Sequence, residues 1–152
     1  MNREIKFRGK RIDNGEWAYG GYGLMPKGDD YAPCIIATEF FEQHEDDEHV
    51  LCIEVIEDTI GQFTGLKDKN GKEVYIGDIV KLEFTPRVYG YMGSSPKGYE
   101  AICTVEFENY AFRFKNINNH QKQHSRNWVF KTLGNEEISN VRIIGNIYSP
   151  TF

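Results

Sequence analysis

The chain has 152 residues, a formal net charge of −5 and an aromatic content of 14%, so it can form one domain or two small ones with a buried core. Ten Phe and nine Tyr exclude a disordered tail. The longest apolar runs fall far short of the roughly 20 residues that cross a bilayer, and no apolar signal segment follows Met1, so we expect a soluble, cytoplasmic protein with no membrane partner.

The charge is distributed unevenly along the chain. Up to Asp58 there are 6 Lys and Arg against 14 Asp and Glu, a net charge of −8, whereas from Thr59 onward there are 12 against 9, or +3. Such an asymmetry is typical of parts with different binding faces. The sequence therefore predicts an N-terminal β region with an acidic loop over residues 1–58 and a C-terminal domain over residues 59–152.

Three cysteines, Cys34, Cys52 and Cys103, are spread widely along the chain. An odd number at wide spacing favours free thiols in a reducing compartment over a disulfide framework. We interpret all three as small core or half-buried residues.

The N-terminal part begins with a predicted hairpin. Residues 5–8 alternate apolar and basic side chains, and residues 17–19 follow the turn signal Asn14-Gly15. Asn-Gly supplies the positive φ angles that tight turns between twisted strands require. The glycine-rich residues 20–23 are expected to form a bulge or a loosened strand end, and residues 26–31 have the composition of a turn.

Two further strands are predicted on either side of an acidic run. Residues 34–37 and 50–56 are rich in apolar and β-branched side chains, which predicts strands, and residues 39–48 between them are expected to be exposed. Residues 59–63 are expected to continue the second of these strands after a kink.

The next segment predicts a second hairpin and its exit. Asn70-Gly71 supplies the turn, residues 73–75 return from it, and Gly77-Asp78 directs the chain into a strand at residues 79–84. Apolar and charged side chains alternate in that strand, so we expect one face to be buried and the other to be exposed to solvent. We interpret the segment as architectural, with core side chains from Phe63, Val74 and Ile79.

The remaining elements predict a small barrel. A long loop, residues 85–98, leads to strands at residues 102–107 and 111–115, which Asn109-Tyr110 joins. Three more elements complete the chain: a strand at residues 128–130, a helical turn within residues 134–139 and a strand at residues 141–148. This order predicts a mainly β protein in which an N-terminal β-hairpin region is followed by a C-terminal SH3-like β-barrel.

Four segments together resemble a known family. They are residues 5–10 (Ile-Lys-Phe-Arg-Gly-Lys), 15–20 (Gly-Glu-Trp-Ala-Tyr-Gly), 62–80 and 145–148 (Gly-Asn-Ile-Tyr). In these segments the chain resembles the YopX family of bacteriophage and prophage proteins. The resemblance implies a phage-encoded protein with an N-terminal β region and an SH3-like C-terminal barrel, and it carries over no catalytic residue. Ala18, where a β-branched residue is expected, and the acidic run after Thr38 depart from the family's pattern.

Potential metal ligands occur in two places but lack the spacing of a metal site. Residues 42–49 are dense in carboxylates and imidazoles, yet they match neither a zinc site nor an EF-hand loop, so we expect a solvated acidic loop. His120 and His124 are spaced for one helical face, but Asn118 and Asn119 before them favour a loop. We therefore expect no metal and no cofactor.

Catalytic motifs are missing from the sequence. It holds no Gly-x-Ser-x-Gly nucleophile elbow and no Walker loop. A dinucleotide-binding motif requires its glycines to lie at the start of a helix, and no helix is predicted after the glycines of residues 20–23. We expect that the protein is not an enzyme.

A basic and aromatic segment, residues 109–131, is a candidate nucleic-acid surface. It holds five basic residues and no acid, with aromatic residues interleaved. Lys and Arg neutralise phosphates while aromatic rings stack on bases. The candidate residues are Arg113, Lys115, Lys122, Arg126, Trp128 and Lys131. The alternative, which we favour, is that Phe112 and Phe114 share one strand face and fill the barrel interior.

Two other segments are candidates for protein contacts. The long loop offers a partner-binding surface whose candidate residues are Arg87, Tyr89, Tyr91, Lys97 and Tyr99. Residues 39–58 hold nine acids and no base, and they can meet the basic segment of a neighbouring copy. The sequence thus predicts a non-catalytic binding or assembly module, expected to be a homo-oligomer or to bind an unknown phage or host protein. A nucleic-acid-associated protein is the alternative.

Overall fold

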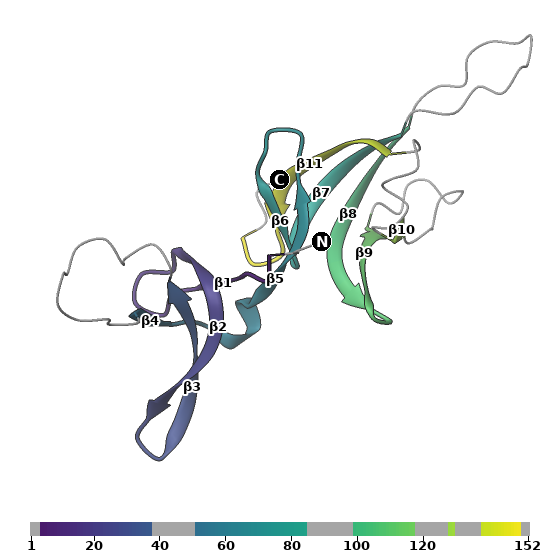
Figure 1. Cartoon of the computed structure of the whole chain (residues 1–152). Coiled ribbons are helices and arrows are strands. Elements are labelled where there is room, and N and C mark those ends of the chain that lie inside the picture. Colours follow the sequence, from purple (N-terminus) through teal and green to yellow (C-terminus); the bar gives the residue numbers. More distant parts are fainter. Residues whose placement is uncertain (1–3, 38–50, 85–98, 118–127, 130–137, 150–152) are drawn as a thin grey trace, which may run out of the picture. The chain divides into compact units, whose positions relative to one another are not determined.

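The structure is a computed structural model that describes residues 4–37, 51–84, 99–117, 128–129 and 138–149. Within these ranges the chain is mainly β, and its one helical element is the short 3-10 helix η1 (Glu57–Thr59) (Figure 1). None of the helical segments in these ranges has the length and apolar character needed to span a bilayer. The mainly β class predicted from the sequence is confirmed.

The chain divides into two compact units, Met1–Gly65 and Leu66–Phe152. Residues 59–65 hold no charged side chain, so these units carry the same net charges, −8 and +3, as the two parts defined by the sequence. The division into separate domains after Asp58 remains a prediction.

The first sheet has six strands in the hydrogen-bonded order β4-β3-β2-β1-β5-β6, and β5 crosses the boundary between the units. Its strands are β1 (Phe7–Lys10), β2 (Trp17–Lys27), β3 (Asp30–Ala37), β4 (Leu51–Glu54), β5 (Gly61–Lys67) and β6 (Glu73–Tyr75). The predicted first hairpin is confirmed, because β1 pairs antiparallel with β2 from Phe7–Gly20 to Lys10–Trp17. The predicted kink before β5 is the single turn of η1.

The prediction that residues 20–23 form a bulge or a loosened strand end is wrong. They lie inside β2, which pairs in regular register with β3 from Gly20–Ala37 to Lys27–Asp30. Residues 26–31 are likewise mostly strand, and only Gly28 and Asp29 form the turn. The glycines serve close packing: a Cβ on Gly20 would lie 2.0 Å from the carbonyl oxygen of Ile36.

A small apolar cluster forms the core of the first unit. Ala18, Ile35 and Val55 are buried in it, and three partly buried side chains pack against them: Phe7, Ile53 and Ile60. Ala18, Ile35 and Phe7 come from three neighbouring strands, and the registers place them on one face of the sheet. This face of the sheet therefore holds the core cluster of the first unit.

The second sheet has five strands in the order β10-β9-β8-β7-β11, with all pairs antiparallel. The strands are β7 (Asp78–Phe84), β8 (Tyr99–Glu108), β9 (Ala111–Asn116), β10 (Trp128–Val129) and β11 (Ile138–Asn146). Figure 1 shows β11 running beside β7 and the long β8–β9 hairpin on the other side. The strands predicted from residue 79 onward are found within the described residues, although β8 and β11 begin earlier than expected and β11 ends at Asn146. The helical turn predicted within residues 134–139 is wrong at Ile138 and Ser139, which belong to β11, and the rest of it lies outside the described residues.

One face of this second sheet holds the larger core. Its buried side chains alternate along the strands as the sequence predicts: Val80, Leu82, Phe84, Ala101, Cys103, Val105 and Phe114, with Val74 from β6. Val80 and Leu82 are completely buried. Within the described residues this sheet is open, with β10 and β11 at its two edges. The predicted antiparallel β unit is therefore present, but these residues do not form a closed barrel.

Candidate interaction surfaces

The turn between β5 and β6 is organised by the carboxylate of Asp68. Its Oδ1 accepts hydrogen bonds from the backbone N–H groups of Asn70 at 2.8 Å and Lys72 at 3.0 Å, and its Oδ2 accepts one from Ile143 of β11 at 3.3 Å. Burial opposes ionisation of this carboxyl, but the three donors outweigh it and lower the pKa of Asp68. The carboxylate therefore ties the turn to the second sheet.

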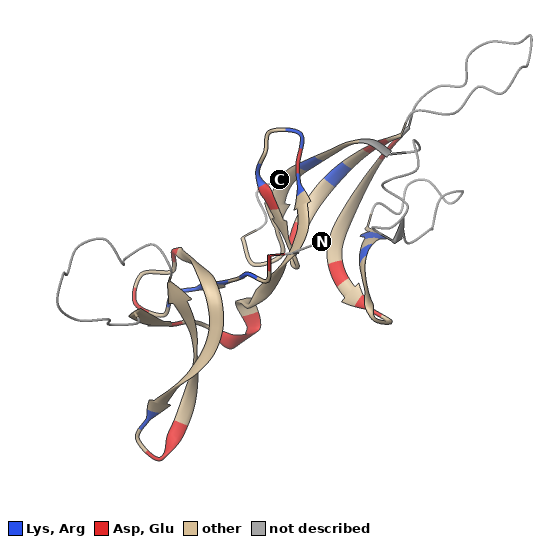
Figure 2. Cartoon of the chain, in the orientation of Figure 1, with Lys and Arg blue, Asp and Glu red and all other residues tan. Residues whose placement is uncertain are grey.

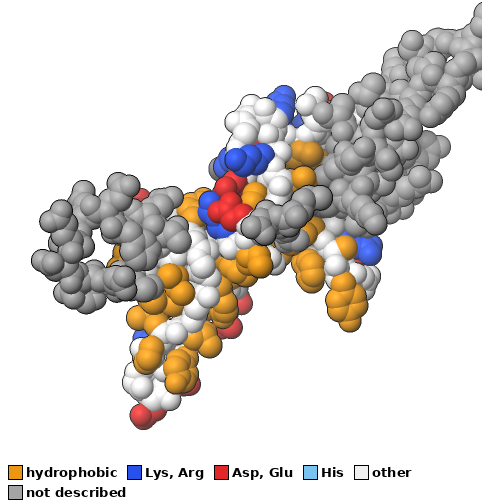
Figure 3. Space-filling view, viewed as in Figure 1, with side chains coloured by type: hydrophobic (Ala, Val, Ile, Leu, Met, Phe, Trp, Pro, Cys, Tyr) orange, Lys and Arg blue, Asp and Glu red, His pale blue; other side chains and the backbone are white. Residues whose placement is uncertain are grey.

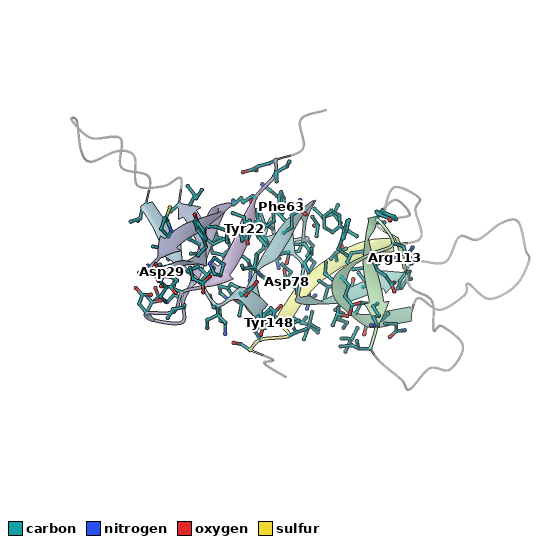
Figure 4. The ribbon with its side chains drawn as sticks, turned by 90° about the horizontal axis from the view of Figure 1, so that it is seen from below. Tyr22, Asp29, Phe63, Asp78, Arg113 and Tyr148 are labelled. Carbon is teal, nitrogen blue, oxygen red and sulfur yellow. The ribbon has the colours of Figure 1, made fainter. Side chains whose placement is uncertain are left out.

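The entry to β7 is a second structural site. Asp78 is 1% exposed, and its Oδ2 accepts a hydrogen bond from the backbone N–H of Tyr75 at 2.9 Å. Gly77 has a φ of +88°, and a Cβ there would lie 3.0 Å from the ring of Tyr148, which Figure 4 labels together with Asp78. The turn expected at Gly77-Asp78 is thus present, and both buried aspartates have architectural roles.

Arg113 and Lys115 of the candidate nucleic-acid surface lie on β9 opposite acidic residues of β8. Lys115 Nζ is 3.3 Å from an oxygen of Glu106, and Arg113 Nε donates a hydrogen bond to the carbonyl oxygen of Glu108 at 3.2 Å. Arg113 is also the register partner of Glu106. The positive charge of these two residues is therefore offset locally by the carboxylate of Glu106, which lies outside residues 109–131.

The aromatic residues of the same strand face inward. Phe112 is 8% exposed and Phe114 is fully buried in the second core. These two rings fill the core, which is the alternative favoured from the alternation of the sequence. The backbone of Trp128 pairs with Phe114 in β10.

The other candidate residues for binding lie almost entirely outside the described residues. These are Lys122, Arg126 and Lys131 of the nucleic-acid surface, and Arg87, Tyr89, Tyr91 and Lys97 of the partner-binding loop. Tyr99 is the first residue of β8. The acidic residues 39–48 and the pair His120 and His124 also lie outside the described ranges.

The β8–β9 turn carries an exposed aromatic residue in an unusual backbone conformation. Asn109 and Tyr110 have φ angles of 50° and 63°, as a tight primed hairpin turn requires, and Tyr110 is 98% exposed. Asparagine tolerates this region, whereas a residue with a large side chain is strained there. The sequence signal was the Asn-Tyr pair in the place where Asn-Gly is usual.

We expect Tyr110→Gly to stabilise the second unit by about 1 kcal/mol, because glycine adopts positive φ without steric cost. Urea unfolding would measure the change. Tyr110→Ala keeps the Cβ and removes only an exposed ring, so we expect it to stay close to the wild type. A loss of stability in both variants would contradict this reading of the turn.

The β2–β3 hairpin presents an apolar face that sequence analysis missed. The register places Tyr22 opposite Ile35, Leu24 opposite Pro33 and Pro26 opposite Tyr31, all on the face that carries the first core. Tyr22, Leu24 and Tyr31 are 44%, 59% and 69% exposed. Figure 3 shows apolar side chains gathered over this hairpin. The larger side chains at every second position from Tyr22 to Pro26 indicate that they share one strand face, but the glycines of this segment disfavour a strand.

The opposite face of β1 and β2 carries a cluster of cations around Trp17. The guanidinium of Arg8 lies 4.4 Å from the centre of the indole ring, and Lys10 Nζ lies 5.6 Å from it. Arg8 is only 4% exposed. Stacking on the indole stabilises the buried guanidinium, so this cluster fixes β1 against β2.

The cysteines of both units are free thiols, as predicted. Burial raises the pKa of Cys103 to about 12, and burial together with the hydrogen bond that its thiol shares with Cys52 raises the pKa of Cys34 to about 11. Both thiols are therefore protonated at neutral pH, and a protonated thiol is a poor nucleophile.

The described residues thus define a mainly β protein of two antiparallel sheets, whose buried carboxylates and thiols are structural and whose candidate sites are exposed surfaces. They hold no group of three or more His, Cys, Asp and Glu placed to bind a metal ion. A family model described as YopX protein matches residues 6–151, so the chain belongs to the YopX family, as the resemblance of its motifs indicated. No curated protein matches the chain.

Proposed function

We propose that this member of the YopX family is a non-catalytic binding or assembly module that associates with itself. The observation that carries the proposal is the exposed apolar face of the β2–β3 hairpin, which continues from the core of the first unit. Exposed contiguous apolar surface on a folded protein typically marks an interaction site. The charge difference between the units, −8 against +3, favours contacts between copies.

The chemistry of the buried polar groups supports a role without catalysis. The oxygens of Asp68 and Asp78 accept backbone hydrogen bonds, and the buried thiols of Cys34 and Cys103 are held protonated. These groups stabilise the fold, and they are poorly placed to act as general bases or nucleophiles.

The proposal also covers the fold of the second sheet, the origin of the protein and its location in the cell. We propose that the second sheet is an SH3-like barrel opened between β10 and β11, because the order β11-β7-β8-β9-β10 is that of a five-stranded meander whose last strand returns beside the first. We also propose a phage or prophage origin and action in the cytoplasm of the bacterial host, on the resemblance described above.

Light scattering tests self-association directly. We expect the purified chain to have a mass that is a multiple of 17.6 kDa and that falls on dilution. A monomer mass at high protein concentration would contradict self-association.

Nucleic-acid binding is the second candidate, favoured by the five basic residues without an acid in residues 109–131. The carboxylate of Glu106, which forms an ion pair with Lys115 and belongs to the register partner of Arg113, weakens that case. We therefore expect no change in fluorescence anisotropy of labelled single-stranded or duplex DNA at low salt. Binding that disappears on changing Lys122 and Arg126 to Glu would instead favour the nucleic-acid function.

A further inference from the structure

We propose that Cys34 and Cys52 form a redox-sensitive dithiol, which a small-molecule disulfide such as oxidised glutathione converts into a disulfide bond between β3 and β4. Both cysteines are free thiols in the structure. The bond would join the two strands at the base of the segment that connects them, residues 38–50. This modification site belongs to the first unit and does not depend on the proposed self-association.

The pairing of β3 with β4 places the two cysteines on one face of the sheet. Cys34 lies opposite Glu54, and Ile36 lies opposite Cys52, so Cys52 is the diagonal neighbour of Cys34 on the adjacent strand. The two thiols share a hydrogen bond. Residues that are far apart in the sequence therefore bring their sulfur atoms together across two strands.

The position of β4 allows the small backbone shift that a bond needs. Diagonal neighbours in an antiparallel sheet have Cα atoms roughly 7–8 Å apart, slightly more than the roughly 4.4–6.8 Å of a disulfide. β4 has four residues and lies at the edge of the six-stranded sheet, where it pairs with β3 on one side. A disulfide that departs from ideal geometry is more easily reduced, so this bond would be reversible.

Burial decides which thiol reacts first. Cys34 is 1% exposed, and a Cβ on Gly23 of the neighbouring strand would lie 3.5 Å from its Sγ atom. Cys52 is only half-buried. A dissolved oxidant therefore reaches Cys52, whereas Cys34 reacts only with a group that Cys52 already carries.

The charges around Cys34 favour the same order. A thiol becomes reactive when a nearby cation stabilises its thiolate. Apart from Lys27 and Asp30 beside the turn, β2 and β3 carry no charged side chain (Figure 2). The register partner of Cys34 on β4 is the acid Glu54, which forms an ion pair with Lys27. Cys34 is thus suited to the second step and not to the first.

The reaction consists of two thiol–disulfide exchanges. The thiol of Cys52 loses its proton to water, and its sulfur attacks one sulfur of the small disulfide, whose S–S bond breaks as one thiolate leaves. The thiol of Cys34 then loses its proton, and its sulfur attacks the sulfur of Cys52 as the second thiolate leaves. Each leaving thiolate takes up one proton. Two protein thiols are oxidised by two electrons, and the small disulfide is reduced to two thiols.

The redox state would control the acidic segment. In a reducing compartment both thiols stay free, which is their state in the structure. When the small-molecule disulfide accumulates, the bond closes a loop that contains the acidic residues 39–48. We expect hydrogen exchange of the β4 amides to slow by at least about tenfold in the oxidised chain, because the bond opposes opening of this edge strand.

Peptide mapping of the wild-type chain tests the site. After incubation in a glutathione redox buffer, free thiols are alkylated in acid and the chain is cleaved after glutamate, because residues 39–48 hold four glutamates and no lysine or arginine. We expect the Cys34–Cys52 bond to exceed any bond to Cys103 by at least about 100-fold. Cys103 is the internal control, since it is fully buried in the other unit.

The same incubation in urea separates the effect of the fold from that of sequence distance. In the unfolded chain, loop closure alone favours the bond between Cys34 and Cys52 over the bond between Cys52 and Cys103 by about fivefold. We expect the native chain to exceed this ratio by more than tenfold. An equal ratio in the native and unfolded chains would overturn the proposal.

Serine variants test the order of the two steps. We expect Cys34→Ser to stop at a mixed disulfide, so that Cys52 gains the mass of one glutathione. In Cys52→Ser we expect Cys34 to remain a free thiol. Circular dichroism checks that both variants fold. A wild-type chain that keeps three free thiols, ends as the mixed disulfide, or forms bonds between chains in place of the internal one would also refute the dithiol.

Discussion

Replacing Gly20 with alanine is expected to destabilise the first sheet by at least about 3 kcal/mol. Gly20 pairs with Phe7 on one side and Ala37 on the other, so it lies where three strands meet. A Cβ there would lie 2.0 Å from the carbonyl oxygen of Ile36 and 2.9 Å from its carbonyl carbon. The clash is with backbone, which cannot rotate away as a side chain can, and the φ of +156° adds strain.

Gly21 provides the matched control for this prediction. A Cβ on Gly21 would lie 3.6 Å from the Cβ of Ile36, an ordinary contact. We therefore expect Gly21→Ala to change the free energy of unfolding by less than about 1 kcal/mol. Urea unfolding followed by circular dichroism, with hydrogen exchange of the N-terminal amides, would measure both variants. Equal losses at the two positions would refute close packing at Gly20.

The second large effect is expected from Asp68→Asn, which should lower the free energy of unfolding at pH 7 by about 2 kcal/mol. The amide retains one acceptor oxygen but presents an NH₂ group where a second is needed. The carboxylate accepts from Asn70, Lys72 and Ile143, so one of these buried N–H groups loses its charged partner. The turn before β6 then loses its tie to β11.

The pH dependence of this effect has a definite sign. The pKa of Asp68 is lower in the folded chain than the roughly 3.9 of an unfolded aspartate. Its stabilisation is therefore fully present above the unfolded pKa and is lost as the pH falls through the folded pKa. We expect the difference between wild type and Asp68→Asn to shrink between about pH 5 and pH 2.

Asp13 is the control for the carboxylate prediction. Hydrogen bonding to Arg11, with which it forms a 2.6 Å ion pair, also lowers the pKa of Asp13, but the pair is exposed to solvent. Water and salt screen such pairs, so Asp13→Asn should leave stability at pH 7 almost unchanged. If both variants showed the same acid dependence, the buried site of Asp68 would have no special role.

The short-range features of the fold could be predicted from the sequence. Asn14-Gly15 and Asn70-Gly71 form turns in which the glycine φ angles are +72° and +82°, because glycine alone adopts these angles without cost. The alternation along β7 predicted which side chains are buried. These features depend on neighbours within a few residues, so local chemistry decides them.

The β2–β3 hairpin could not be predicted in the same way. Glycines at 20, 21 and 23 and a proline at 26 disfavour a strand when the segment is taken alone. In the structure, pairing with β3 outweighs that preference, and the absence of a side chain at Gly20 is what lets the strands approach. Strand pairing between distant residues thus decided an element that local propensity opposed.

The sequence by itself determined the family, the mainly β class and the positions of the Asn-Gly turns, because these follow from motifs and local backbone preferences. Only the tertiary structure decided the candidate sites. It placed Glu106 and Glu108 beside the basic residues Lys115 and Arg113 of β9. It buried the rings of Phe112 and Phe114, and it left Tyr22, Leu24 and Tyr31 exposed on one face. Alternation in a strand says which residues share a face, but whether that face is covered depends on packing between elements far apart in the chain.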